Sequence, residues 1–531
     1  MRGVLLMELI NETIGSYTTK SFNKFADKEA LVYMEDNRRF TFGKLNYEID
    51  MIAKSLISIG IKKGDHIALL SSNSPEWIIV FLATLKIGAV SVCLNYSSTE
   101  EEIDYMLKQS DSTILIVSDK DMIEKVDLEK FTYLKVTLKM KTLFNLGLIM
   151  SQMKNVLNDD LMNIANNVFP NDIATILYTS GTTGKPKGIM FTHSAVLNGP
   201  LSFNENFGYT MQDTILVTLP LNHILGGKYT ALLGLLAGST IVLMKKFKTD
   251  VALKAIENEK CTGFHGVPTM YQYLLNKCDS YDLSSLRVGM IAGAVSSETL
   301  IKDIMERLHI TELNNTFGQT ETLGVTQTPI YDKNDLKVNT VGKPVDNVEI
   351  KICDIKSGKT LPPNTEGELC VKSPYCMVGY YNNPIATNVT VIDNWVHTGD
   401  IAFIDEDGYL SIKGRLKDVI IRGGENISPT DIENHLIKHS EIENAIIVGV
   451  PDETLGEEIF AFVKVKKSST LTKEDILNFL SGKISKYKFP KYIEFINTFP
   501  LTSTGKIKRN SLKQIATKKM NPTVLDEIAI N

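Results

Sequence analysis

Helix and strand patterns alternate between residues 46 and 118. Apolar residues recur at helical spacing over 46–59, and Ser74-Pro75-Glu76 has the cap, the proline and the acid that are typical of a helix start. Short apolar runs between the helices predict strands at 66–70, 90–94 and 112–118. Because parallel strands must be joined by crossovers that are usually helices, this order predicts a mainly parallel sheet covered by helices.

The alternation returns over residues 249–292 and predicts a second sheet of the same kind, whereas 119–168 has weak periodicity and is interpreted as peripheral. From about residue 340 the apolar runs become short and are separated by turn residues, which predicts a small antiparallel β subdomain. We therefore predict an α/β protein with two domains. The large N-terminal domain would span residues 1–415, and a small α+β C-terminal domain would span residues 416–531.

Composition excludes several classes of protein. The chain of 531 residues has a formal net charge of −5, whereas nucleic-acid binders usually show a basic excess, so we predict no nucleic-acid partner. The longest apolar stretch, 229–244, is shorter than the roughly 20 residues of a membrane span. We interpret it as a core helix followed by a core strand. The six cysteines form no CxxC pair and no zinc-site spacing, which favours a reduced, cytoplasmic location.

One loop carries strong chemical information. The segment Tyr178-Thr-Ser-Gly-Thr-Thr-Gly-Lys-Pro-Lys-Gly188 follows an apolar run at 173–177. Its small residues let backbone N–H groups approach an anion, while hydroxyls and two lysines add donors and positive charge. It is not a Walker A loop, because Pro186 stands where Ser or Thr would be needed for Mg²⁺. The segment 178–188 therefore predicts a phosphate-binding loop.

Six further segments follow this loop in order: Leu219-Pro-Leu-Asn-His223, Gly293-Ala294-Val295, Thr316-Phe-Gly-Gln-Thr-Glu321, Trp395-Val-His-Thr-Gly-Asp400, Gly414-Arg-Leu-Lys-Asp418 and Pro500-Leu-Thr-Ser-Thr-Gly-Lys506. Together they resemble the motifs of the adenylate-forming superfamily, which includes acyl-CoA synthetases, peptide adenylation domains and firefly-type luciferases. The resemblance covers essentially the whole chain in the expected order. The branch that the chain resembles is that of the acyl-CoA synthetases, or fatty acid–CoA ligases.

The resemblance implies an ATP-dependent reaction. In this family a carboxylate is joined to the α-phosphate of ATP, pyrophosphate is released, and the acyl group passes to the thiol of coenzyme A. The expected small molecules are therefore ATP, Mg²⁺, coenzyme A and a fatty or other apolar acid. By resemblance, ATP or AMP would contact Thr179, Ser180, Gly181, Thr182, Thr183, Gly184, Lys187, Gly293, Ala294, Val295, Thr316, Phe317, Gly318, Thr320, Asp400, Arg415 and Lys506.

Individual roles follow from the same resemblance. Glu321 would bind Mg²⁺, and Thr320 would contact the α-phosphate. Asp400 would accept hydrogen bonds from the ribose hydroxyls, and Phe317 would lie against the adenine. Lys506 would enter the site and bridge the carboxylate and the α-phosphate.

The remaining motifs imply movement and an acyl pocket. Lys417 would be the hinge about which a mobile C-terminal domain rotates, and Gly423 and Gly424 would then face the pantetheine arm of coenzyme A. His223 is expected to act at the entrance of the acyl pocket, although the aromatic residue that the family places before it is Asn222 here. The candidate pocket residues are His223, Val267, Leu323 and Gly324.

The predicted function is an AMP-forming carboxylic acid–CoA ligase. The alternative is a stand-alone adenylation enzyme that loads a carrier-protein phosphopantetheine, because both share every ATP motif. Retention of Thr320, Glu321, Asp400, Arg415 and Lys506 argues against a catalytically silent nucleotide-binding protein. A luciferase-like oxidase is neither supported nor excluded. The sequence also leaves open a homodimer and an acyl carrier protein as partner.

Overall fold

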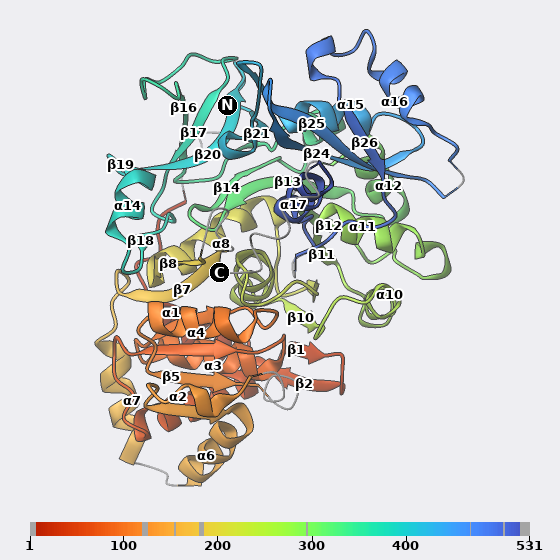
Figure 1. Ribbon diagram of the computed structural model, residues 1–531. Coiled ribbons are helices and arrows are strands. Elements are labelled where there is room, and N and C mark those ends of the chain that lie inside the picture. The colour runs from red at the N-terminus through yellow and green to blue at the C-terminus, as the bar shows by residue number, and fades with distance from the viewer. Residues whose placement is uncertain are drawn as a thin grey trace.

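The computed structural model describes residues 7–118, 126–152, 156–179, 185–293, 296–467, 469–502 and 505–520. Two large sheets lie side by side in the N-terminal part, a smaller β-sheet follows, and a C-terminal unit lies at one end of the molecule (Figure 1). This is the predicted fold class: the two large sheets are mainly parallel, the third is antiparallel, and the C-terminal unit is α+β.

The first sheet has the strand order β18-β8-β7-β4-β3-β5-β6. Strands β3 to β7 are parallel to their neighbours, while β8 and β18 add antiparallel pairs at one edge. The bounds are β3 (His66–Leu70), β4 (Val90–Leu94), β5 (Ile114–Val117), β6 (Val136–Lys139), β7 (Ile173–Thr179), β8 (Lys187–Thr192) and β18 (Gly379–Tyr380).

The second sheet has the order β15-β14-β13-β12-β11-β9-β10-β1-β2 and is parallel from β13 to β1. Its bounds are β1 (Glu29–Tyr33), β2 (Arg38–Thr41), β9 (Thr214–Val217), β10 (Thr240–Leu243), β11 (Gly263–Gly266), β12 (Val288–Ala292), β13 (Glu312–Gln319), β14 (Leu323–Gln327) and β15 (Lys343–Pro344). Strand β1, from the start of the chain, pairs with β10.

Helices separate the two sheets and cover their outer faces. The main core contains side chains from one face of each sheet and from the helices between them: α1 (Ile14–Lys24), α2 (Phe42–Ser58), α3 (Pro75–Lys86), α8 (His193–Phe207) and the π-helix η2 (Ile224–Leu232). Helix α4 (Glu100–Gln109) covers the other face of the first sheet. The other face of the second sheet is covered by α10 (Thr249–Glu259), α11 (Pro268–Leu275) and α12 (Glu298–Arg307).

Local sequence signals explain several helix starts. Thr99 and Glu102 form the predicted capping box of α4, and the Ser74 hydroxyl caps α3, whose first residue is a proline. The segment interpreted as peripheral is more ordered than its weak periodicity suggested, because β6 extends the first sheet there. The short helices that complete the N-terminal part are α6 (Met140–Gln152), α7 (Val156–Asn166), α9 (Leu233–Leu236), α13 (Asn334–Asn339) and α14 (Pro384–Thr390).

The third and fourth sheets follow each other in the chain. The third is antiparallel and contains β16 (Glu349–Cys353), β17 (Gly367–Lys372), β19 (Val391–Ile392), β20 (Trp395–Ile404) and β21 (Leu410–Arg415). The fourth contains β22 (Ile420–Arg422), β23 (Glu425–Ile427), β24 (Ile442–Asp452), β25 (Gly456–Val465) and β26 (Tyr492–Phe495), with helices α15 (Pro429–Leu436), α16 (Lys473–Leu480) and α17 (Arg509–Met520). A single 3-10 turn, η4 (Leu416–Asp418), lies between the two sheets.

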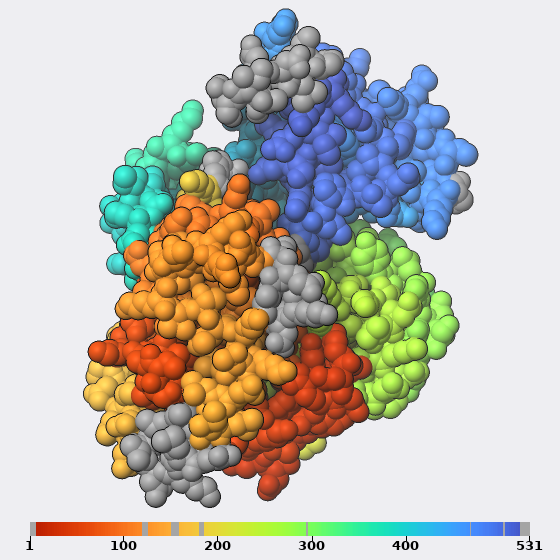
Figure 2. Space-filling model, turned by 60° about the horizontal axis from the view of Figure 1, so that its bottom comes forward, coloured from red at the N-terminus to blue at the C-terminus, as the bar shows by residue number. Residues whose placement is uncertain are grey.

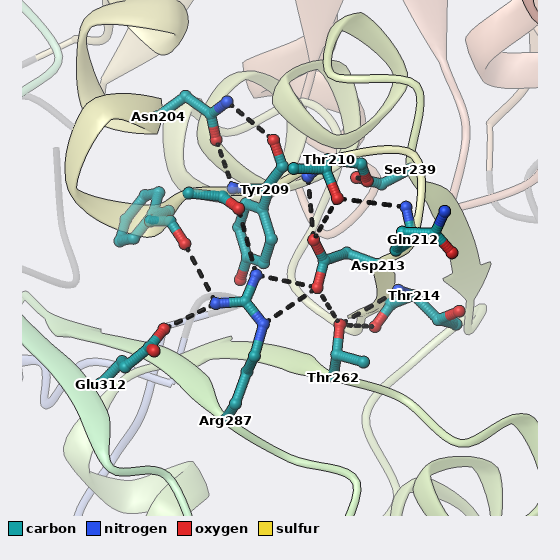
Figure 3. A network of polar contacts seen from close by, with 12 residues as sticks. Asn204, Tyr209, Thr210, Gln212, Asp213, Thr214, Ser239, Thr262, Arg287 and Glu312 are labelled. Carbon is teal, nitrogen blue, oxygen red and sulfur yellow. Dashed lines mark hydrogen bonds and ion pairs between the residues drawn. The ribbon is translucent and has the colours of Figure 1, made fainter.

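A polar network ties together the amino ends of the parallel strands in the second sheet (Figure 3). Asp213, which precedes β9, accepts hydrogen bonds from Arg287, which precedes β12, and from the Thr262 hydroxyl before β11. Arg287 also pairs with Glu312 at the start of β13, with 2.6 Å between Nη1 and Oε2. These contacts hold four strands in register and leave the opposite, carboxyl edge available for chemistry.

Across the described residues, no helix combines the length and the apolar character that crossing a membrane requires.

Candidate active site

The predicted site residues of the second sheet lie at the carboxyl ends of its strands. His223 follows β9, Val267 follows β11, Gly293 follows β12, and Phe317 lies near the end of β13. In open α/β sheets the crevice outside the carboxyl ends is where ligands bind. The structure therefore gathers residues that are far apart in sequence at one edge.

The predicted phosphate loop joins two antiparallel strands of the first sheet. Thr179 ends β7 and is paired with Lys187, which begins β8. The predicted phosphate-binding residues between them, Ser180, Gly181, Thr182, Thr183 and Gly184, lie outside the described residues, as do Ala294 and Val295. The Lys187 ammonium lies over the ring of Tyr380, 4.7 Å from its centroid.

Tyr380 connects this hairpin to the predicted metal ligand. Its hydroxyl donates a hydrogen bond to Oε1 of Glu321 over 3.0 Å. The second oxygen of Glu321 accepts no hydrogen bond from the described residues. One oriented carboxylate with a free oxygen suits Mg²⁺, which is usually held by one or two carboxylates and by substrate phosphates. Tyr380 was missed by the sequence reasoning, because nothing near it in the sequence marks it.

Asp400 lies in a buried, charged setting. Its side chain is 3% exposed, and its Oδ1 lies 3.0 Å from Nε of Arg415, which is opposite it on β21. Burial raises the pKa of Asp400, and the charge of Arg415 opposes that rise. The amide of Gln319 donates hydrogen bonds to Asp400 Oδ2 and, over 2.9 Å, to the Thr398 carbonyl. Gln319 therefore couples the predicted adenine motif to the predicted ribose motif.

The turn before Asp400 is held by Glu368 on β17. One carboxylate oxygen accepts a hydrogen bond from the Gly399 N–H over 3.1 Å, and the other lies 2.8 Å from Nδ1 of His397. Gly399 has φ +68°, a left-handed conformation that favours glycine. Glu368 and Gln319 are positioning residues that the sequence reasoning missed, since their partners lie 31 and 81 residues away.

Lys506 reaches this region from the C-terminal unit. A Cβ placed on Gly293 would lie 2.5 Å from Lys506 Cε, so the lysine passes directly over that glycine. The loop is docked by a hydrogen bond of 3.1 Å from the Thr269 hydroxyl to the Gly505 carbonyl. Figure 2 shows the blue C-terminal unit seated beside the green segment that contains Thr269. Burial lowers the pKa of Lys506, and the nearby Arg415 charge lowers it further.

The neighbouring Arg509 serves as an anchor for the lysine loop. Its guanidinium donates two hydrogen bonds to Glu433, of 2.6 and 2.9 Å, and its Nε lies 3.8 Å from Asp418 of the turn η4. The loop that carries Lys506 is thereby connected to the segment predicted to be the hinge.

His223 lies close enough to Lys506 to feel its charge. It precedes the π-helix η2, and its Nδ1 is buried without a hydrogen-bond partner among the described residues. Burial and the adjacent Lys506 charge lower the pKa of His223 to about 3, so the imidazole is neutral at pH 7. Val267, another predicted pocket residue, lies beneath the lysine loop, with Cγ2 3.1 Å from a Cβ placed on Gly505.

Leu323 and Gly324 lie in a second cluster. Leu323 is fully buried, and the Gly324 N–H donates a hydrogen bond of 2.6 Å to the Tyr229 hydroxyl. A Cβ on Gly324 would meet the ring of Phe203 at 2.3 Å, so only glycine fits. The adenine candidates nearby differ in exposure: Thr316 is buried, Phe317 is half-buried, and Gly318 and the turn residue Thr320 border solvent.

The predicted hinge residue and the predicted coenzyme A residues lie on separate elements of the C-terminal unit. Lys417 lies in η4 beside Arg415, and burial lowers its pKa, with the Arg415 charge acting in the same direction. Gly423 and Gly424 lie on the exposed β22–β23 hairpin with positive φ angles of +57° and +87°. The Gly423 N–H donates a hydrogen bond to the Leu455 carbonyl. In this arrangement the hairpin is paired with β25 of its own unit.

The positions of the cavities match the predicted site residues only in part. A cavity of about 550 Å³ lies between the N-terminal segment and residues 374–378 and contains none of the predicted site residues. A smaller one of about 180 Å³ lies beneath the lysine loop and is lined by Leu219, Thr269 and Thr502 among others. The chemistry of the residues, more than cavity size, therefore identifies the site.

Comparisons with known proteins agree with this geometry. The sequence model described as "AMP-binding enzyme" matches residues 18–381, and the model described as "AMP-binding enzyme C-terminal domain" matches residues 431–506. The chain is 34% identical to the putative acyl-CoA synthetase YngI of Bacillus subtilis, covering 97% of this chain and 99% of that protein. It is 34% identical to the mitochondrial medium-chain acyl-CoA ligase ACSF2 of Mus musculus, covering 95% and 88%.

A solved structure adds a ligand-bound example. The anthranilate CoA ligase AuaEII, in complex with anthranoyl-AMP, superimposes with a TM-score of 0.84 at 26% identity. The match covers 97% of this chain and 99% of that one.

Proposed function

This chain belongs to the family of AMP-binding enzymes, and on that premise we propose that it is an AMP-forming carboxylic acid–CoA ligase. It activates an acid with ATP and transfers the acyl group to coenzyme A. The observation that carries this proposal is Lys506, which passes over Gly293 and lies near both Arg415 and Asp400. A lysine brought in by a separate unit, and seated where the nucleotide motifs converge, fits an adenylation step.

In the first step a carboxylate oxygen of the acid attacks the α-phosphorus of ATP, and the bond to pyrophosphate breaks. Both reactants are anions, and two unit charges 4 Å apart repel by about 4 kcal/mol at an effective dielectric near 20. We assign Lys506 to neutralise that repulsion, with Thr320 at the α-phosphate. Burial and the charge of Arg415 lower the pKa of Lys506, and the incoming phosphates favour its charged form.

The nucleotide would be held by the converging motifs. Asp400, oriented by Gln319 and paired with Arg415, would accept hydrogen bonds from the ribose hydroxyls. Lys187 and the loop that precedes it would bind the β- and γ-phosphates. Glu321, oriented by Tyr380, would hold Mg²⁺, which when bound would offset negative charge on the phosphates.

In the second step the thiol of coenzyme A attacks the acyl carbonyl, AMP leaves, and the thiol proton is lost. Gly423 and Gly424 lie on an exposed hairpin that is bonded to Leu455 of its own unit, and we propose that the C-terminal unit turns to bring them to the acyl-AMP for this step. We propose that it does so as a domain of residues 416–531 about Lys417, relative to residues 1–415. The anchor from Arg509 to Asp418 would then move the lysine loop together with the hinge turn.

Coenzyme A is favoured over a carrier protein as the acceptor. The relatives described above are named as an acyl-CoA synthetase or an acyl-CoA ligase. The mouse relative is named as mitochondrial and as medium-chain, and we propose a mainly apolar chain for the acid here as well. A cytoplasmic location and a homodimer stay predictions, which fractionation and analytical ultracentrifugation would test.

The test is a pyrophosphate-release assay with Mg²⁺-ATP across acids of graded chain length and aromatic acids. We expect release that depends on one class of acid, and an acyl-CoA product only when coenzyme A is added. Lys506→Ala should abolish release while ATP still binds. Release by Lys506→Ala at the wild-type rate would refute the lysine's role. Acyl transfer only to a purified carrier protein would refute the choice of acceptor.

A further inference from the structure

The loop that carries Lys506 is closed by its own hydrogen bonds. The Thr502 N–H donates a hydrogen bond of 2.7 Å to the Lys506 carbonyl, and the Thr502 hydroxyl accepts one of 3.1 Å from the Lys506 N–H. Leu501 and Ile507 pair as an antiparallel β-bridge across the same turn. Because the loop is held together in this way, the position of the lysine depends on where the whole loop is seated.

The loop is seated on the start of helix α11 and on the residue that follows strand β12. The Thr269 hydroxyl donates its hydrogen bond of 3.1 Å to the carbonyl of Gly505, the residue directly before Lys506. The Val267 side chain lies 3.1 Å from a Cβ placed on Gly505 and 3.5 Å from one placed on Gly293, over which the lysine passes. The polar contact from Thr269 therefore lies one residue away from the lysine that it would position.

Packing beneath the loop is incomplete. The cavity of about 180 Å³ at this interface is lined by Thr269 of the N-terminal part and by Leu501, Thr502 and Gly505 of the loop, among others. Atoms that line a gap have no partner atoms on that side and lose those dispersion contacts. The loop thus gains less from packing than a filled interface would provide, and the hydrogen bond from Thr269 carries a larger share of the docking free energy.

The contact is weak enough to be broken in every turnover. Thr269 is half-buried, so water can reach its hydroxyl and replace the lost acceptor when the loop leaves. A hydrogen bond that is exchanged for bonds to water contributes only a modest net free energy, which corresponds to roughly a two- to tenfold change in an equilibrium. A contact of this strength favours the docked loop without trapping it there.

We propose that Thr269 is a positioning residue for adenylation, whose bond to the Gly505 carbonyl sets the balance between the docked loop and the turned arrangement that forms the thioester. The inference rests on the ligase function and on the domain rotation proposed above. A contact that is present in only one of two arrangements shifts the equilibrium towards it, and its removal favours the other. Loss of the Thr269 hydroxyl should therefore slow adenylation without slowing thioester formation.

The test measures both half-reactions: acid-dependent exchange of pyrophosphate into ATP, and thioester formation from synthetic acyl-AMP and coenzyme A. Thr269→Val keeps the shape of the side chain and should lower the rate of adenylation by roughly two- to tenfold, with no loss in thioester formation. Thr269→Ser keeps the hydroxyl and should retain most of the adenylation rate. The control Thr18→Val removes a hydroxyl-to-carbonyl hydrogen bond within α1 and should leave the ratio of the two rates unchanged.

The ratio of the adenylation rate to the thioester-forming rate decides the outcome. The role of Thr269 is refuted if Thr269→Val has the wild-type ratio, or if Thr269→Ser loses as much adenylation as Thr269→Val. If Thr269→Val fails to fold, Thr269→Ala is compared with Thr269→Ser by the same ratio. In each of these cases the wild type still makes acyl-CoA, so the ligase function stands. If the wild type releases pyrophosphate with no acid, the ligase function falls and this inference falls with it.

Discussion

Replacing Gly293 by alanine should slow the adenylation step far more than the thioester-forming step. The new Cβ would lie 2.5 Å from Lys506 Cε, whereas carbon atoms in contact are normally about 3.5–4.0 Å apart. The lysine must therefore move by roughly 1 Å, and a displacement of that size in a reacting group can cost about 100-fold in rate. The rate of thioester formation should fall much less, because that step does not need the docked lysine.

The backbone contributes a separate effect that a matched control removes. Gly293 has φ +89°, and alanine in the left-handed region costs about 1–2 kcal/mol. Gly60 has φ +87° and nothing within 4 Å of the added Cβ. Gly60→Ala should therefore lower the Tm to a similar extent without changing either half-reaction.

The assay separates the two half-reactions of purified protein. Adenylation is followed as acid-dependent exchange of pyrophosphate into ATP, and thioester formation is followed from synthetic acyl-AMP and coenzyme A. Equal losses in the two half-reactions for Gly293→Ala would refute the reasoning. So would wild-type adenylation, because it would mean that Lys506 does not pass over this glycine during catalysis.

Three further predictions concern protonation, metal and stability. Burial lowers the pKa of Lys506 in the ligand-free protein, and we propose the ammonium as the active form. The kcat/KM of adenylation, which reports the free enzyme, should therefore decline as pH rises, with a midpoint below the 10.5 of free lysine, and a kcat/KM that stays flat up to that pH would contradict this. Tyr380→Phe removes the hydrogen bond to Glu321, the proposed Mg²⁺ ligand, and should raise the Mg²⁺ concentration for half-maximal rate about tenfold. Tyr381→Phe, which removes a hydroxyl bonded to Asp111 instead, should leave that Mg²⁺ concentration unchanged. Equal effects of the two substitutions would argue against an orienting role for Tyr380. Arg287→Ala should lower the free energy of unfolding by about 2 kcal/mol, because it leaves a buried carboxylate without its cation. Arg39→Ala removes exposed ion pairs and should lower the free energy of unfolding, measured by urea denaturation, by less. A larger loss for Arg39→Ala than for Arg287→Ala would contradict the stabilising role of the network around Asp213.

Much of the fold could be predicted because its signals are local. The capping box at Thr99 and Glu102 and the proline start of α3 depend on residues within one helical turn. The π-helix could not be predicted from the apolar run at 229–244. Its geometry depends on how Gly226 and Gly227 approach carbonyls of the preceding turn, and hydrophobic periodicity does not report such contacts.

The candidate site also contains residues with local sequence signals and residues whose role depends on distant contacts. Asp400, Glu321 and Lys506 could be predicted as site residues because they stand in recognisable motifs. Gln319, Glu368 and Tyr380, which orient them or their loops, act through partners on other strands. Their side chains become informative only when the sheets place those partners within hydrogen-bond distance.

The pairing of β1 with β10 has a consequence for biosynthesis. Leu31 aligns with Ile241, and the Thr240 hydroxyl donates to the Glu29 carbonyl across 211 residues of chain. On the ribosome β1 can pair with β2 at once, but its other edge must stay open until β10 has been translated. An open strand edge readily recruits other chains, so the nascent protein needs shielding during that interval. A fragment cut between these two strands would expose the same edge permanently and should aggregate.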